Sequence, residues 1–392
     1  MTPASQHENC RIVAGLVRPS VERGLVRIRS YAKEGVLHRT GPFAAGGRGL
    51  IVLGLDALSQ EFMADLWSPS ERFSLTSTFP STSVLAWPSA LSGKSVDELN
   101  LCGVVYFDAK ANGLFHAFRD LFLPLGSWDW SAEARPASAV TLGPWDNVFS
   151  DLACVGAVAR DGDLAAWPGR WADALLHGAV RRRDSQVFAD IRFKPAEIVE
   201  WAVRQVSAEV DASVREPPAF VWTFVNFDDY VHARGYTSEL REALRRLERS
   251  VERWVQAGYS VVCHSDHGMV PCQVAPEVWH EWEHLAGPEN CRLPAGGAGR
   301  VRWIYPRKLD AASLRDLHGR LSELLKGDAM VLYRSQLADM GLLPRAICSG
   351  PAIGELVALA TGPGFPVPDP SYRWEHGSAT AAEMICPVAV WR

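Results

Sequence analysis

The stretch VVCHSDHGM, residues 261–269, places an adjacent Asp-His pair directly after an apolar run. Neighbouring side chains of a strand point to opposite faces, so Asp266 and His267 can serve one site only if the strand has ended and the backbone turns. Gly268 follows them and permits such a turn. An acid and an imidazole in a turn at a strand end are well placed to hold a metal ion.

Acids and histidines recur at the ends of other apolar runs. Asp56 follows GLIVLGL, Asp228 follows PAFVWTFVNF and precedes His232 by four residues, and WEHGSATAAEM near the C-terminus contributes His376. Taken singly, a carboxylate at a strand end often caps the next helix, and a lone histidine is often a hydrogen-bonded core residue. Together, three aspartates and three histidines supply two sets of nitrogen and oxygen ligands, which suit zinc with an open position on each ion.

Strands and helices alternate along the part of the chain that carries these residues. Apolar runs rich in β-branched residues predict strands at 49–58, 101–107, 218–229, 259–268 and in GRVRWIYPR. Helical spacing predicts helices over 195–210, 238–258 and 310–326, and a further one begins near the serines after Pro80. This order predicts an α/β fold with a mostly parallel central sheet flanked by helices, in which ligands bind at the carboxyl ends of the strands.

Three parts of the chain differ in composition. Residues 1–45 are mixed and have no assigned role, 46–108 plus 196–392 carry the strand and helix pattern of a catalytic core, and 109–195 are rich in Trp, Gly and Pro. We expect the last part to be an inserted cap that determines substrate specificity. Trp128, Trp130 and Trp145 could stack on a base or pack in the core.

Composition limits the partners and the location of the protein. The 392 residues have a formal net charge of −5, which argues against binding to bulk nucleic acid. No apolar stretch is long enough for a membrane helix and no signal-peptide core begins the chain, so we expect a soluble, cytoplasmic protein. The eight cysteines include no CxxC pair and are expected to be free thiols rather than zinc ligands.

Five motifs together resemble a known family. IVLGLD, FPSTSVLAWPSALSGK, DDYVHARG, SDHGM and HGSATAAEM occur in the order and spacing of the alkaline phosphatase superfamily, and the branch they most resemble is the type I phosphodiesterases/nucleotide pyrophosphatases. The resemblance covers residues 49–108, 218–270 and 370–392. It implies an alkaline-phosphatase-like core and a hydrolase for a small phosphoester or nucleotide-like substrate.

The resemblance implies two divalent metal ions, zinc in this family. One ion would bind Asp56, Asp266 and His267, and the other Asp228, His232 and His376. Asp228 is chosen over its neighbour Asp229 because the family motif has an Asp-x-x-x-His spacing.

The resemblance also implies a Thr or Ser nucleophile ten residues before the glycine of a TG or SG pair. Counting back from Gly93 gives Ser83, with Thr82 and Thr78 as alternatives. A hydroxyl at a helix N-terminus faces free backbone N–H groups that favour a bound phosphate, and coordination to a metal lowers its pKa. Attack would give a phosphoseryl enzyme that water hydrolyses. Ser83 could also act as a helix N-cap.

The sequence departs from the family pattern after this helix. Family members often have an asparagine downstream that contacts the phosphoryl oxygen, and the aligned position here is Val105, with Asn100 out of register. The run Val84-Leu85-Ala86-Trp87 is apolar, and no Arg or Lys follows until Lys94. An apolar wall beside the nucleophile favours diesters or phosphoanhydrides over monoesters, with a phosphomonoesterase or phosphomutase as the alternative.

A rival motif occurs in HEWEHLAGPEN, which fits HExxH at 280–284. In a zinc peptidase, His280 and His284 would bind the ion and Glu281 would act as general base. The third ligand position of the extended motif holds Asn290, a poor zinc ligand, and the helix between Pro276 and Gly287 is short. A non-catalytic binding protein on the same fold is a further alternative. A sulfatase is disfavoured because no Cys-x-Pro-x-Arg motif is present.

Overall fold

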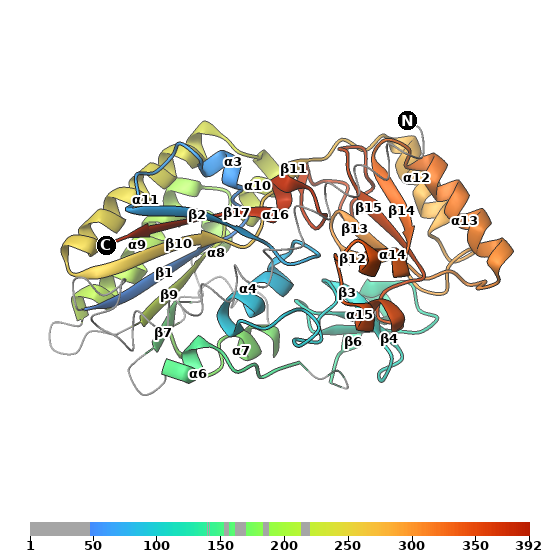
Figure 1. The fold of residues 1–392 in the computed structure, drawn as a ribbon, viewed down its shortest axis with the longest axis horizontal. Helices are drawn as coiled ribbons and strands as arrows, with labels where there is room; N and C mark the ends of the chain where they lie inside the picture. The colour runs from blue at the N-terminus through green and yellow to red at the C-terminus, as the bar shows by residue number, and fades with distance from the viewer. Residues whose placement is uncertain are drawn as a thin grey trace.

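The computed structural model describes residues 48–138, 140, 142–152, 157–160, 170–182, 188–212 and 220–392. The expected N-terminal segment 1–45 therefore lies outside the described residues. Figure 1 shows two lobes side by side, each built around its own sheet. The lobes are formed by segments that alternate along the chain, so neither lobe is one continuous stretch.

The first sheet has seven strands in the order β2-β17-β10-β1-β9-β7-β8. Its five parallel strands are β10 (Tyr259–Ser265), β1 (Gly49–Leu55), β9 (Phe220–Val225), β7 (Ala157–Arg160) and β8 (Val180–Arg182). β17 (Ile385–Trp391) pairs antiparallel with both β10 and β2 (Glu71–Thr76). β9 and β10 are buried along their whole length, which explains their continuous apolar sequences.

Helices cover both faces of this sheet (Figure 1). Ile51 and Leu53 of β1 pack in one core with α3 (Gln60–Met63), α9 (Pro195–Ala212) and α11 (Ser238–Gln256). Leu50 and Val52 point the other way and pack in a second core with α4 (Ser83–Ser92), α6 (Val148–Leu152) and α7 (Arg170–Leu175). α8 (Phe188–Ile191) packs beside α9. Alternate side chains of one strand thus hold both helical layers in place.

The second sheet has eight strands in the order β14-β15-β13-β12-β3-β4-β5-β6, and every neighbouring pair is antiparallel. The strands are β14 (Ala329–Tyr333), β15 (Leu356–Ala360), β13 (Val301–Ile304), β12 (Gly296–Ala298), β3 (Val105–Asp108), β4 (Gly113–His116), β5 (Leu121–Pro124) and β6 (Arg135–Pro136). α12 (Pro276–Leu285) and α13 (Ala311–Leu324) pack on it through a core that contains Trp282, Leu317 and Ile304. α5 (Trp130–Glu133), α14 (Arg334–Asp339) and α15 (Arg345–Ser349) complete this lobe.

The expectation of a mostly parallel sheet is met only in part: the strands of the first sheet from β10 to the edge strand β8 are parallel, whereas β17, β2 and the whole second sheet are antiparallel. The strands expected at 101–107 and in GRVRWIYPR belong to the antiparallel second sheet as β3 and β13. Residues 109–195 supply β4, β5 and β6 to the second sheet and β7 and β8 to the first. The sequence indicates where strands occur but not which strands pair with one another. A specificity role for 109–195 stays a prediction.

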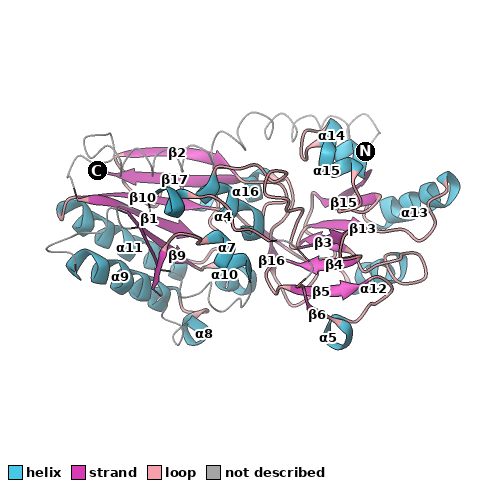
Figure 2. Cartoon of the chain, turned by 90° about the horizontal axis from the view of Figure 1, so that it is seen from below, coloured by secondary structure: helices cyan, strands magenta, loops and turns pink. Residues whose placement is uncertain are grey.

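A short connection lies between the lobes. β11 (Val270–Pro271) pairs antiparallel with β16 (Trp374–Glu375), and Figure 2 shows β16 between the two sheets. α10 (Asp228–Arg234) packs against β16, and α16 (Ala381–Met384) precedes β17. This pairing brings the segment near the C-terminus to the carboxyl ends of β9 and β10. Among the described helices, none combines the length and apolar character needed to span a bilayer.

Candidate metal centre

The carboxyl ends of the central strands meet at one point. Asp56 follows β1, and its backbone N–H donates to the carbonyl of Val225 at the end of β9 (3.0 Å). Asp266 follows β10, and its Oδ1 accepts from the backbone N–H of Ala57 (3.3 Å) and of His267 (3.0 Å). Ala57 has φ 65°, so the chain turns sharply after β1. These turns point the acids into the space beyond the sheet.

The first cluster consists of Asp56, Asp266 and His267, all of them buried. The Nε2 atom of His267 lies 3.5 Å from Oδ1 of Asp56 and 3.4 Å from Oδ2 of Asp266. One ligand atom from each residue lies within 4.8 Å of the other two. Two carboxylates and one imidazole converge as a three-ligand cation site requires.

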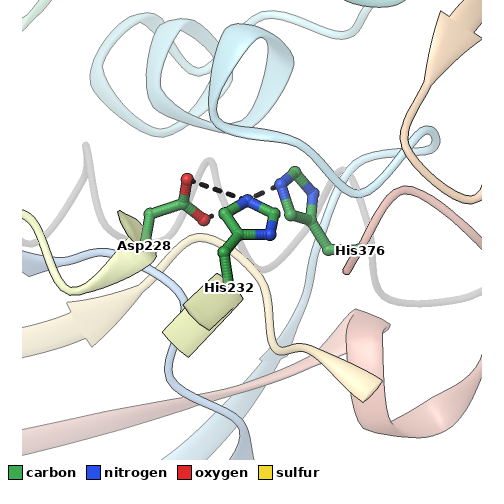
Figure 3. A group of neighbouring side chains, drawn as sticks. All are labelled: Asp228, His232 and His376. Atoms are coloured by element: carbon green, nitrogen blue, oxygen red, sulfur yellow. Dashed lines mark ion pairs between the residues drawn. The ribbon is translucent and has the colours of Figure 1, made fainter. Parts of the chain in front are cut away.

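The second cluster consists of Asp228, His232 and His376, and Figure 3 shows the carboxylate turned toward both imidazoles. Asp228 begins α10, where its N–H donates to Oδ1 of Asn226 (2.7 Å), and His232 lies one helical turn later on the same face. The Nε2 of His232 is 3.2 Å from Oδ2 of Asp228, and the Nε2 of His376 is 3.7 Å from its Oδ1. His376 follows β16.

The three imidazoles share one orientation. The Nδ1 atom of His232 lies 2.7 Å from the carbonyl of Trp374, that of His376 lies 2.7 Å from the carbonyl of Ser81, and that of His267 lies 3.2 Å from the carbonyl of Gly268. A carbonyl oxygen can only accept, so each Nδ1 must carry the proton. Nε2 is then the ring nitrogen that faces the carboxylates and can bind a metal ion, which is the arrangement that metal-binding histidines adopt.

Two carboxylate oxygens in these clusters are buried without a hydrogen-bond partner, Oδ1 of Asp228 and Oδ2 of Asp266. Burial of an unpaired anionic oxygen costs several kcal/mol unless a cation compensates it. The ion pairs that involve these two atoms are with histidines only. A divalent ion in each cluster would satisfy both oxygens, so the residues fit two metal ions.

The three histidines of the two clusters differ in their pKa. Burial lowers the pKa of His267 and of His376 to about 4, so both are neutral ligands at neutral pH. Burial also lowers the pKa of His232, but Asp228 and Glu375 outweigh it and raise the pKa to about 10. The carboxylates around His232 therefore favour a proton on its ring. A metal cation can take the place of that proton in the second cluster.

The two aspartates near the clusters differ in their own pKa. Burial would raise the pKa of Asp228, but the three surrounding histidines hold it well below its usual range. Burial raises the pKa of Asp266 to about 6, although hydrogen bonds from Ser83 and Ala57 oppose this. Both are ionised at neutral pH and can bind a cation.

Ser83 lies against the first cluster. It is the first residue of α4, its Oγ donates to Oδ1 of Asp56 (3.3 Å), and the same atom lies 3.2 Å from Nε2 of His267. Thr82 is the N-cap residue instead, and its buried hydroxyl has no hydrogen-bond partner. The hydroxyl of Thr78 donates to the carbonyl of Pro80, away from both clusters.

Contacts between histidine rings and backbone join the two clusters into one site. The rings of His267 and His376 stack with centroids 3.7 Å apart. Ser81, just before α4, accepts from His376 and donates through its hydroxyl to the carbonyl of Ser378 (2.8 Å). The start of α4 and the loop after β16 are therefore fixed together, although Ser81 and Ser378 lie 297 positions apart in the sequence.

A cavity of about 910 Å³ opens from the second cluster toward the second sheet. Thr82, Asp228, His232 and His376 line one end. Its walls elsewhere come largely from the second lobe: Val104, Val105, His116, Phe118, Trp128, Trp130, Trp282 and Arg302. Tyr372 stacks on His232 with centroids 4.0 Å apart and also lines the cavity.

Several expectations about this wall need correction. Val84, Leu85, Ala86 and Trp87 are fully buried in the core below α4, so they do not form a wall of the cavity. The apolar surface comes from the second lobe, including Val105, which lies on the cavity and takes the place of the asparagine that family members often have. Asn100 is not among the lining residues. Trp145 is buried in the core, whereas Trp128 and Trp130 line the cavity.

The HExxH segment does not form a metal site. His280 and Glu281 lie on α12 with side chains 78% and 49% exposed, and His284 is also exposed. Within the described part of the chain, the groups of residues able to hold a metal are the two clusters above. The motif is a solvent-facing stripe of a helix whose other face packs Trp282 and Leu285 into the core.

Sequence reasoning missed several residues that support the clusters. The hydroxyl of Tyr236 donates to the carbonyl of Ala57 (2.9 Å) and accepts from the N–H groups of Met269 (2.9 Å) and Ser59 (3.2 Å). Oε1 of buried Glu375 lies 3.6 Å from Nε2 of His376. Glu375 could have been noticed beside His376 in WEHG, but nothing in the sequence marks Tyr236.

Known proteins share this architecture. A family model described as type I phosphodiesterase/nucleotide pyrophosphatase matches residues 53–377. No curated protein sequence matches the chain. Murine ectonucleotide pyrophosphatase/phosphodiesterase 5 has a similar fold, with a TM-score of 0.58 and 14% identity over 87% of each chain. Phosphonoacetate hydrolase from Sinorhizobium meliloti, solved with phosphonoformate, gives 0.57 and 15% over 88% of this chain and 90% of the other.

At 14% and 15% sequence identity, the likeness to these two structures concerns the fold alone. The family model, in contrast, covers most of the chain and includes all residues of both clusters. The chain therefore belongs to the type I phosphodiesterase/nucleotide pyrophosphatase family and is a hydrolase that acts on phosphoester bonds.

Proposed function

We propose that the protein is a metal-dependent phosphodiesterase or nucleotide pyrophosphatase that uses Ser83 as a covalent nucleophile. The observation that carries the proposal is the position of the Ser83 hydroxyl, 3.3 Å from Asp56 and 3.2 Å from His267 of the first cluster. The stacked rings of His267 and His376 join this cluster to the second one at the cavity.

Two zinc ions fit the donor atoms of the proposal. Asp56, Asp266 and His267 would hold one ion, and Asp228, His232 and His376 the other. Three nitrogen and oxygen ligands with an open position are typical of catalytic zinc. When bound, the pair supplies Lewis acidity that lowers the pKa of a nearby hydroxyl and neutralises charge on the phosphoryl oxygens.

The protein residues position the reaction. The first turn of α4 presents Ser83 with free backbone N–H groups, which favour the phosphoryl group there. Oγ of Ser83 bonds to phosphorus, the P–O bond to the leaving group breaks, and the Ser83 proton departs on the side of Asp56, which accepts its hydrogen bond. In the resulting phosphoseryl enzyme, phosphorus keeps the second substituent of the diester. Water then displaces Oγ of Ser83 from phosphorus, the monoester product leaves, and Ser83 regains its proton.

Diesters and phosphoanhydrides are the proposed substrates, nucleotide-like in size. Valines and aromatic side chains line the cavity beyond the second cluster, so an organic substituent would find apolar contact there. A monoester dianion has one more non-bridging oxygen and one more negative charge to stabilise than a diester, and it gains less from such a wall. A phosphomonoesterase or phosphomutase of the same superfamily is the alternative.

The test compares two variants and two substrates. We expect Ser83→Ala to reduce hydrolysis of bis(4-nitrophenyl) phosphate at least ~1,000-fold, since the covalent route needs this hydroxyl. Thr82→Ala is the matched control, because it removes the adjacent hydroxyl and keeps Ser83. A dead Thr82→Ala enzyme with an active Ser83→Ala enzyme would move the nucleophile by one residue. A faster reaction with 4-nitrophenyl phosphate, after correction for uncatalysed rates, would favour the monoesterase.

A further inference from the structure

Arg302 is a buried cation on the wall of the cavity, on the side of the second lobe. It lies on β13, opposite Gly297 of β12, and only 9% of the residue is exposed. Its Nε donates to the carbonyl of Gly296 (3.3 Å) and its Nη2 to the carbonyl of Ala295 (3.2 Å). Nη1 is buried and has no hydrogen-bond partner among the described residues.

An unpaired guanidinium nitrogen in such a place needs an explanation. A guanidinium has five N–H donors in a fixed plane, and leaving them without acceptors in a buried site is unfavourable. Burial lowers the pKa of Arg302 to about 10, with Glu375 opposing this, so the side chain is still charged at neutral pH. A permanent, largely buried charge on a residue that lines the cavity can pair with an anionic ligand.

The surroundings of Arg302 indicate the shape of that ligand. Its guanidinium carbon lies 5.8 Å from the ring centroid of Trp282, and half-buried Trp128, Trp130 and Trp279 line the same cavity. Gly296 and Gly297 also line the cavity, although the positions of their missing Cβ atoms point at Val105 and Val301 and not into open space. The half-buried indole rings give a flat organic group an aromatic surface to stack on.

The charge on the wall favours a single negative charge. Arg302 is buried, whereas Arg119, the other arginine on the cavity, is exposed. The carboxylates of Glu283 and Asp369 also line the cavity, and Glu375 interacts with Arg302 itself. A single buried guanidinium with acidic neighbours suits a monoanionic, planar acceptor better than a dianion.

We propose that Arg302 and the tryptophans around it form a subsite for a carboxylate carried by a flat ring on the substrate. This inference rests on the proposed function, because the phosphoryl group would occupy the metal end of the same cavity. The substrate class is then a phosphodiester or phosphoanhydride with a carboxylated aromatic or heterocyclic substituent. The carboxylate pairs with the guanidinium of Arg302, which lines the cavity.

The test uses the full-length, zinc-loaded protein and two matched diesters. Both release 4-nitrophenol, and their second substituent is 4-carboxyphenyl in one and the neutral 4-carbamoylphenyl in the other. We expect the ratio of their kcat/KM values to favour the carboxylate by at least about tenfold, or about 1.4 kcal/mol. In Arg302→Met the ratio should fall to about one.

Two further variants make the result specific. Arg119→Met removes the same charge from the exposed arginine, and the preference should remain, because a solvent-screened cation contributes little. Arg302→Lys keeps the charge without the planar fork, and the ratio should fall at least about threefold. This variant also serves if methionine prevents folding, which thermal unfolding and zinc content would reveal. A wild-type ratio near one, or a preference that survives both Arg302 changes, overturns the subsite.

A binding measurement separates this inference from the proposed function. Calorimetry with zinc-loaded Ser83→Ala protein compares 4-carboxyphenyl phosphate with 4-carbamoylphenyl phosphate and needs no turnover. Tighter binding of the carboxylate that is lost in the Ser83→Ala, Arg302→Met double variant supports the subsite even if no ester is hydrolysed. If both diesters are hydrolysed but the two phosphates bind equally tightly, the proposed hydrolase function stands and the subsite is contradicted.

Discussion

Each histidine at the candidate metal centre is oriented by a backbone carbonyl rather than by a side chain. Trp374, Gly268 and Ser81 supply these acceptors, and each carbonyl is held by the local backbone. A main-chain acceptor cannot be changed by substitution at its own position, so the orientation of the imidazoles is built into the fold. Ser81 has a second effect, because it also fixes the start of the helix that presents Ser83.

At the residue scale, the account predicts that His376→Ala lowers metal content and activity together. Loss of one of three ligands should remove about one of two zinc ions and reduce diester hydrolysis at least ~100-fold. Elemental analysis by mass spectrometry measures the zinc, and a nitrophenyl diester assay measures the rate.

The matched control is His280→Ala on exposed α12, which should keep both zinc and activity. If His280→Ala lost zinc while His376→Ala kept its zinc and activity, the metal site would be the HExxH segment instead.

At the scale of the element, the turns after β1 and β10 depend on one phenol. The Tyr236 hydroxyl bonds to Ala57, Ser59 and Met269, and the side chain stacks on Phe62 with centroids 4.6 Å apart. Tyr236→Phe keeps the ring but leaves two N–H donors and one carbonyl without this partner. We expect a loss of about 2–4 kcal/mol in the free energy of unfolding, and weaker zinc binding.

Tyr106→Phe is the control for this change. Tyr106 is also buried, but its hydroxyl donates to the carbonyl of Asn100 over a long distance of 3.5 Å. Urea unfolding of both variants compares the losses directly. A cost for Tyr106→Phe equal to that for Tyr236→Phe would show that the hydroxyl does not hold the turns.

The strand β10 also contains an imidazole with no evident use. His264 is buried, both of its ring nitrogens lack a hydrogen-bond partner, and the ring packs edge-on to Trp87 with centroids 5.2 Å apart. Burial lowers the pKa of His264 from 6.5 to about 4. The unfolded chain takes up a proton at this residue below pH 6.5 and the folded chain does not, so this residue makes stability fall as pH decreases from 6.5 to 4.

His264→Leu should remove this pH dependence. The variant is expected to gain stability relative to the unsubstituted protein by about 2 kcal/mol between pH 7 and pH 5, because each pKa unit corresponds to about 1.4 kcal/mol. Urea unfolding of the metal-free proteins at both pH values measures the difference. An equal difference at pH 7 and pH 5 would mean that His264 titrates normally.

At the scale of the whole molecule, the sequence predicts one lobe better than the other. β1, β9 and β10 are recognisable because burial on both faces makes them continuously apolar, and the acids at their ends follow from the parallel arrangement. The second sheet is not recognisable as a unit. Its β3–β6 and β12–β15 come from segments far apart in the chain, and the pairing of Gly297 with Val105 has no local signal.

The difference between local sequence signals and long-range strand pairing also explains which site residues could be predicted. The six ligand candidates stand at strand ends in recognisable motifs, and the structure brings them together in the expected two groups. The wall of the cavity could not be predicted, because Val105, Trp282 and Arg302 reach it only through the pairing of the second sheet. Tyr236 and Glu375 act through hydrogen bonds and charge that no spacing reveals.

The most direct test of the central claim is the search for a phosphorylated serine. Zinc-loaded protein is mixed with a nitrophenyl diester, quenched in acid within the first turnovers and digested for peptide mass spectrometry. We expect an adduct on Ser83 that consists of the phosphoryl group with the ester substituent that did not leave, and it should be absent from Ser83→Ala and from protein stripped of metal. Diester hydrolysis that proceeds with no adduct on Ser83, and continues in Ser83→Ala, would contradict the covalent two-metal account.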